Sequence, residues 1–270
     1  MSEETLPAAE EHAELPPWLP VAGLAIGFLG ALCGIGGGLF AVPLLHYVCR
    51  FELRTCVATG LVLVFATTSS STVTELVRGD FQMPWGVIGA LVAGVLVGAQ
   101  LGFRLSQRMP VRTWKAVFAV VLTVAGMRIL FGSPPPPSDE LVTELGALAL
   151  GNAALTGLLG GFVAPLLGVG GGLFMVPGLY LGPTGLDFVG ARACSLAAGA
   201  VGSARSLRLH AKTGRVRWAH GLALAAGALG GAAVGVYAVR LPILADVARW
   251  LLGVLLVITA LRFARDWRRG

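Results

Sequence analysis

Apolar residues in this chain fall into long blocks rather than into a two-residue or 3.6-residue rhythm. Blocks of about 18 or more nearly uncharged residues are typical of membrane-spanning helices. The pattern predicts plain spans at residues 56–77, 86–103, 116–131, 189–207, 218–238 and 248–264. It also predicts two longer apolar segments, residues 18–48 and 141–181, each interrupted by three consecutive glycines.

The two glycine-interrupted segments repeat one another. Residues 34–43 read GIGGGLFAVP and residues 168–177 read GVGGGLFMVP, so eight of ten positions match at an offset of 134. A GxxxGxxxG pattern, which is typical of close helix contact in membranes, also occurs once in each half, at Gly94, Gly98 and Gly102 and at Gly227, Gly231 and Gly235. The chain is therefore predicted to consist of two homologous halves, each with one Gly-rich segment followed by three transmembrane helices.

These patterns divide the chain into five parts. They are an acidic N-terminal tail (1–17), a first transmembrane repeat (18–131), a Pro-rich linker (132–140), a second transmembrane repeat (141–265) and a basic C-terminal tail (266–270). The linker follows from its proline run, because proline cannot continue a helix and the run is stiff and extended.

Composition and charge agree with an all-α integral membrane protein. The 270 residues are 56% hydrophobic and only 13% charged, about half the charged share of a soluble domain. The net charge of +6 does not indicate nucleic acid, because Lys and Arg stand in short clusters between apolar blocks. If each Gly-rich segment enters and returns on one side, 15 Lys and Arg, Arg262 among them, face the cytoplasm, as the positive-inside rule expects. The 5 that face outside are Arg78, Arg128, Arg192, Arg240 and Arg249. If every segment crosses once, neither side is favoured. The charges therefore predict inverted halves in a bacterial plasma membrane.

The triple glycines are the candidate functional feature. Glycine costs about 1 kcal/mol relative to alanine inside a helix, and Pro43 and Pro177 remove further backbone bonds. Irregular backbone at membrane depth persists only where it is buried in protein or lines a wet cavity. Broken helices at matching places of two halves indicate a transporter's binding site, whereas a close-packing kink is the alternative. Whether the segments are re-entrant or fully spanning is left open by the sequence.

Half-helices that begin after the glycines suit an anion, because their N-termini carry free N–H groups and a partial positive charge. Hydroxyls of the following span could also bind an oxyanion, and Thr59, Thr67, Ser70 and Thr74 are predicted to form one polar stripe. The alternative is that such hydroxyls bond the carbonyl one turn back. The predicted substrate-binding residues are Gly36, Gly37, Gly38, Pro43, Thr59, Thr67, Ser70, Gly170, Gly171, Gly172, Pro177, Ser195 and Ser203.

Ionisable residues near the spans are candidates for proton coupling, and His46 and Glu75 come first. In the alternative reading His46 is a packing residue, and Glu75 is solvated at the outer end of its span. We expect no metal, because the cysteines and histidines lack metal-ligand spacing. We expect no cofactor and no enzyme activity, since the glycines fit neither a P-loop nor a dinucleotide fingerprint and no HExxH or GxSxG occurs.

The two GxGGGxxxVP motifs resemble those of the sulfite exporter TauE/SafE family, also called the toluene sulfonate uptake permease family. The resemblance extends over residues 20–265 and includes Thr59-Gly60-Leu61, Cys194-Ser195-Leu196, Gly79 and Gly214. Family members often have Thr-Ser-Leu at the first of these places, so a ligand role for that serine carries over to Ser195 alone. The resemblance implies a plasma-membrane permease for sulfite or organosulfur anions.

The leading hypothesis is a secondary transporter of a small anion, most simply sulfite or an organosulfonate, without an ATPase subunit. A passive anion channel, a carrier of a non-sulfur carboxylate, and a membrane anchor or assembly protein are the alternatives. The GxxxGxxxG faces could pack within one chain or between two chains of a homodimer.

Overall fold

The computed structural model describes residues 15–79, 83–106, 112–131 and 146–269, and every regular element in these residues is a helix. The helices of the first half are α1 (Leu19–Cys33), α2 (Gly38–Tyr47), α3 (Leu53–Arg78), α4 (Trp85–Ser106) and α5 (Arg112–Phe131). Those of the second half are α6 (Ala147–Leu167), α7 (Gly172–Tyr180), α8 (Phe188–Ala211), α9 (Trp218–Ala238) and α10 (Pro242–Arg269). The predicted all-helical class is confirmed, and both halves have the same order of elements.

Each Gly-rich segment forms two helices separated by a short break. In the first half the break follows α1, where Gly37 has a φ of 83°. In the second half it follows α6, where Gly171 has a φ of 80°. These left-handed backbone angles are readily adopted only by glycine, which explains why the same glycines occur in both halves.

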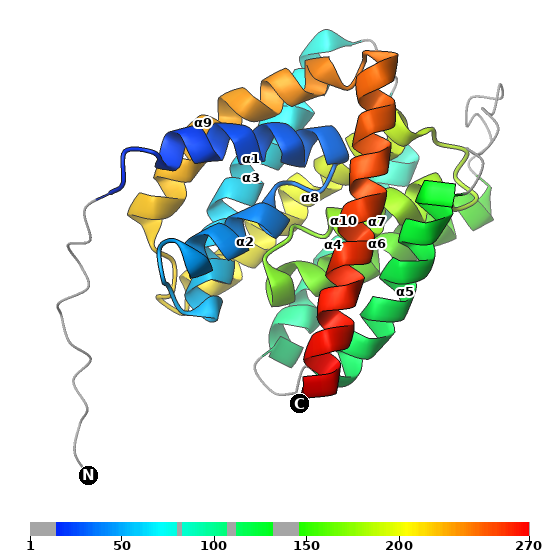
Figure 1. Cartoon of the computed structure of the whole chain (residues 1–270). Coiled ribbons are helices and arrows are strands. Elements are labelled where there is room, and N and C mark those ends of the chain that lie inside the picture. The colour runs from blue at the N-terminus through cyan, green and yellow to red at the C-terminus, as the bar shows by residue number, and fades with distance from the viewer. Residues whose placement is uncertain (1–14, 80–82, 107–111, 132–145, 270) are drawn as a thin grey trace.

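The two halves interlock rather than lying beside each other. Helix α1 of the first half packs along α9 of the second, and α6 packs along α4 (Figure 1). Both contacts use the GxxxGxxxG faces, since Cβ atoms on Gly98 and Gly231 would collide with the carbonyl oxygens of Leu158 and Leu24. These faces are therefore filled within one chain and do not supply the homodimer contact that was the alternative.

Helices α5 and α10 lie side by side at one edge of the bundle (Figure 1). Five helices in the described residues, α3, α4, α6, α9 and α10, are long and apolar enough to cross a membrane. Helices α1 and α2 are shorter apolar helices. The inverted arrangement of the halves stays a prediction, and the linker at 132–140 lies outside the described residues.

Candidate functional site

The two breaks meet back to back in the middle of the protein. A Cβ on Gly38 would collide with the carbonyl oxygen of Gly168, and a Cβ on Gly172 would collide with that of Gly34. Each half-helix therefore begins against the break of the other half. The predicted glycines Gly36, Gly37, Gly38, Gly170, Gly171 and Gly172 are all buried at this crossing.

A pair of hydroxyls lies beside the crossing, between α3 and α8. Thr68 Oγ1 and Ser203 Oγ are 3.4 Å apart and both side chains are buried. A Cβ on Gly36 would lie 3.0 Å from the Thr68 methyl group, so this threonine touches the first break. Ser195 Oγ donates a hydrogen bond to the Gly34 carbonyl at 3.0 Å. The structure thus places Ser195 and Ser203, two of the predicted substrate-binding residues, at the crossing.

Thr68 was missing from the predicted set, which contained its neighbour Thr67. A signal for it exists in the sequence, because Thr68 and Ser203 share the offset of 135 that relates Gly79 to Gly214. Thr67 is also buried, but its hydroxyl has no hydrogen-bond partner among the described residues.

In the predicted polar stripe on α3, the hydroxyls of Thr59, Ser70 and Thr74 contact backbone groups. Thr59 Oγ1 accepts from the backbone N–H of Arg217 at 3.1 Å, and Ser70 Oγ donates to the Leu229 carbonyl at 2.7 Å. Thr74 bonds back to the Ser70 carbonyl at 2.8 Å, the alternative raised for these hydroxyls. Three- to four-residue spacing defines a helix face but not what covers it, and here α9 packs on the Ser70 face.

His46 lies on the surface at the end of α2, with Nδ1 2.9 Å from the Phe51 carbonyl oxygen. It is therefore apart from the crossing. Among the described residues, no group of three His, Cys, Asp or Glu side chains could hold a metal ion.

Glu75 is not solvated, which corrects one reading of the sequence. Its side chain is 1% exposed and pairs with Arg192, whose side chain is 0% exposed. Its second carboxylate oxygen is 2.9 Å from a guanidinium nitrogen of Arg240. Arg192 was also assigned to the outside as a topology charge. It lies inside α8 instead, because the carboxylate of α3 offers it a buried partner.

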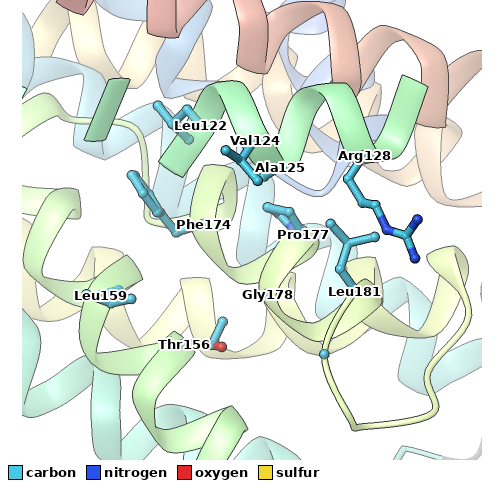
Figure 2. A pocket seen from close by; sticks show the side chains of 11 residues that line it. Leu122, Val124, Ala125, Arg128, Thr156, Leu159, Phe174, Pro177, Gly178 and Leu181 are labelled. Atoms are coloured by element: carbon cyan, nitrogen blue, oxygen red, sulfur yellow. The ribbon is translucent and has the colours of Figure 1, made fainter. Parts of the chain in front are cut away.

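A cleft of about 600 Å³ lies between α5, α6 and α7 (Figure 2). Its walls are mostly apolar, and they include Phe174 and the predicted Pro177 on the short helix α7. Figure 2 shows Arg128 extending from α5 past Leu181, so that its guanidinium lies at the edge of the cleft.

A second cleft of about 410 Å³ lies between α2, α10 and the end of α6. Phe40, Pro43 and Arg262 line it, and they stand 134 residues before or after Phe174, Pro177 and Arg128. This cleft also reaches Gly38 and Val169 at the crossing. The duplicated halves therefore build the same cleft twice, beside each short helix.

Among the described residues, one ionisable side chain lines each cleft, and in both it is an arginine. A guanidinium on an apolar wall binds the oxygens of a carboxylate or sulfonate by charge-assisted hydrogen bonds. Sequence reasoning missed both arginines as site residues because it counted them only as topology charges. Their shared offset of 134 was the available signal.

Several curated relatives carry transporter names. "Probable membrane transporter protein" of Xylella fastidiosa is 26% identical over 253 residues, which cover 91% of this chain and 94% of the relative. "Probable membrane transporter protein YunE" of Bacillus subtilis is 30% identical over 106 residues, or 39% of this chain and 38% of the relative. "Probable membrane transporter protein MamO" of Magnetospirillum gryphiswaldense is 30% identical over 123 residues, or 43% of this chain and 20% of the relative. The match thus spans well under half of YunE and MamO.

No solved structure matches the chain. The apolar helices of the described residues, together with the membrane-protein names of the relatives, support a multi-pass membrane protein. The family model described as "Sulfite exporter TauE/SafE" matches residues 2–129 and 153–270. The chain therefore belongs to the sulfite exporter TauE/SafE family.

Proposed function

We propose that the chain is a secondary transporter of a small organic anion, with an organosulfonate as the best-fitting substrate class and sulfite as the second. The observation that carries this proposal is the pair of matching clefts, each beside a broken helix and each with an arginine as the one ionisable residue that the structure describes in its lining. A cationic group in both clefts favours an anion over a cation.

The apolar walls favour an anion with a hydrocarbon part. Volumes of about 600 Å³ and 410 Å³ lie in the range of pockets for small organic ligands. Sulfite would lose its hydration against apolar walls without enough polar partners in return. An organosulfonate can place its sulfonate on the arginine and its carbon chain against Phe174 or Phe40.

In this proposal the anion passes from one cleft to the other across the contact of the two breaks. The hydroxyls of Thr68 and Ser203 lie beside this contact and can donate hydrogen bonds to an oxyanion without holding it by charge. Because the breaks touch through glycine backbones, a small separation of the halves opens a passage between the clefts. Relatives from several bacteria support a place in a bacterial plasma membrane.

The test is flux into proteoliposomes that contain the purified full chain. Sulfoacetate, sulfite and sulfate are compared with malonate, which replaces the sulfonate of sulfoacetate with a carboxylate, each with and without a pH gradient. We expect saturable flux of sulfoacetate that the gradient raises. Flux that rises linearly with concentration would favour a channel, preference for malonate would favour a carboxylate carrier, and no flux of any anion would refute transport.

The matched control for this assay is a change of arginine outside the clefts. Arg128→Gln removes the cationic side chain of the first cleft, whereas Arg54→Gln removes an exposed arginine at the start of α3. Arg128→Gln should lower flux at low sulfoacetate concentration, and Arg54→Gln should leave it unchanged. Equal effects of both changes would show that the cleft arginine has no special role.

A further inference from the structure

A buried charge cluster joins the two halves next to the first break. Glu75 lies near the end of α3, while Arg192 lies in the first turns of α8 and Arg240 follows α9. Arg192 also donates a hydrogen bond from Nη1 to the Ala31 carbonyl at 3.0 Å, at the end of α1. A Cβ on Gly34 would lie 2.7 Å from its Cγ. The cluster therefore touches the break itself.

The cluster contains more positive charge than its carboxylate can balance. Two guanidinium groups share the single carboxylate of Glu75, and the Nε atoms of Arg192 and Arg240 have no hydrogen-bond partner among the described residues. Burying an excess charge is costly unless an opposite charge is near.

Such an arrangement has the chemistry of an oxyanion site. Guanidinium groups offer paired N–H donors that fit the oxygens of a carboxylate or a sulfonate. Here the Glu75 carboxylate fills that place, and it is attached to the first half while both arginines belong to the second half. Glu75 is thus a tethered anion in a two-arginine site.

The second half has no equivalent cluster among the described residues. At the offset of 135, His210 stands where Glu75 would be and Val57 stands where Arg192 would be. His210 Nε2 lies 3.1 Å from the Pro165 carbonyl oxygen, and Val57 is an apolar residue of α3. The duplicated fold therefore forms without this ion pair, which points to a role beyond holding a repeat together.

Resting on the proposed function, we propose that Arg192 and Arg240 form an oxyanion-binding site that the Glu75 carboxylate closes from within. A transported sulfonate or carboxylate displaces Glu75 and takes its place between the two guanidinium groups. Release of Glu75 unlinks α3 from α8 and frees the break that Arg192 touches.

The test is the dissociation constant of sulfoacetate for the detergent-purified full chain, measured by calorimetry. Glu75→Gln removes the competing charge and keeps the shape of the side chain. Because a blocked site weakens apparent affinity by its open fraction, we expect the constant to fall about tenfold or more. Glu52→Gln, an equal charge change at an exposed residue, should leave the constant unchanged.

Arg192 is tested first, in a variant that keeps no charge at either of the two buried positions 75 and 192. The double variant Glu75→Gln/Arg192→Gln keeps a neutral pair and should lose the tight binding that Glu75→Gln gains. Arg240→Gln, at a half-exposed position, should weaken binding in the Glu75→Gln background and serves as the second variant if the first double variant does not fold.

Unchanged or weaker binding by Glu75→Gln, or tight binding that survives loss of Arg192 or Arg240, would overturn this site. If wild-type flux of sulfoacetate is saturable in that case, the transport function stands and only the tethered-anion site falls. If no anion is transported or bound by the wild type or by Glu75→Gln, both proposals fall.

Discussion

Replacing Gly38 with alanine tests whether the contact of the two breaks is the moving part of the protein. Gly38 begins α2, and its missing side chain is the space that the Gly168 carbonyl fills. A methyl group there collides with backbone rather than with the end of a flexible side chain. The methyl group must therefore push the first half away from the second.

The cost can be worked out from the surroundings of the contact. Adding a methyl group to a well-packed core costs about 1–3 kcal/mol. Gly168 cannot retreat easily, because its own Cβ direction is closed by the Val57 backbone at 3.1 Å. We therefore expect a loss of about 2–3 kcal/mol in the free energy of unfolding. If only ~1.4 kcal/mol of this loss falls on the transport step, flux drops about tenfold.

The assay combines sulfoacetate flux in proteoliposomes with thermal unfolding in detergent. Gly89→Ala is the matched control, because Gly89 lies within α4 and a Cβ there meets nothing within 4 Å. This control should be stabilised by about 0.5–1 kcal/mol and keep its flux, since alanine favours a helix over glycine. Wild-type flux and stability in Gly38→Ala would show that the breaks are not tightly packed, and our account of the site would be wrong.

Other expectations concern the clefts, the charge cluster and the helix contacts. Arg128→Gln should raise the KM for sulfoacetate by about ten- to a hundredfold, since a hydrogen bond to a charged group contributes about 1.5–3 kcal/mol. An unchanged KM in flux titrations would exclude anion binding in the cleft that Arg128 lines. Glu75→Gln should destabilise the protein by about 3–5 kcal/mol in thermal unfolding, and Glu75→Gln/Arg192→Gln by much less, because a lone buried charge costs more than a neutral pair. Equal losses of stability in the two variants would contradict an energetic coupling between Glu75 and Arg192. Gly231→Ala should loosen the packing of α9 on α1, because a Cβ there meets the Leu24 backbone. Gly230→Ala should not, because a Cβ at that position meets nothing within 4 Å. Equal thermal stabilities of these two variants would argue against the interlocked halves.

Much of the fold follows from the sequence because its main signals are local. Apolar blocks predict the helices, and the plain span predicted at 218–238 coincides with α9 (Trp218–Ala238). The doubled glycine motif predicts two breaks, which lie where the left-handed glycines Gly37 and Gly171 require them. The partner of each GxxxGxxxG face was not predictable, because a small-residue face specifies close approach but does not identify the helix that approaches.

The charged residues of the site were harder to predict. Arg192 and Glu75 are 117 residues apart in the sequence, and nothing local to either residue indicates the other. Counting Lys and Arg by loop treats every arginine as a surface charge, so Arg192, Arg128 and Arg262 all entered the topology argument instead of the site. The repeat offset would have paired Arg128 with Arg262, but it could not reveal Arg192, whose counterpart is Val57.

The repeat has the same residue at some corresponding positions of its two halves, such as Gly38 and Gly172, and different residues at others, such as Glu75 and His210. This difference has a physical reason. Gly38 and Gly172 each face the carbonyl of the other break, so neither half can change its glycine without moving the other half. Glu75 and His210 are not part of this glycine contact and bond to different partners, so they can differ. One end of the α3–α8 pair therefore has an ion cluster, and the other has a contact between His210 and the Pro165 backbone carbonyl. In the proposed transporter, an anion leaving at the first end would compete with Glu75 for this ion cluster, whereas the described residues place no such cluster at the other end.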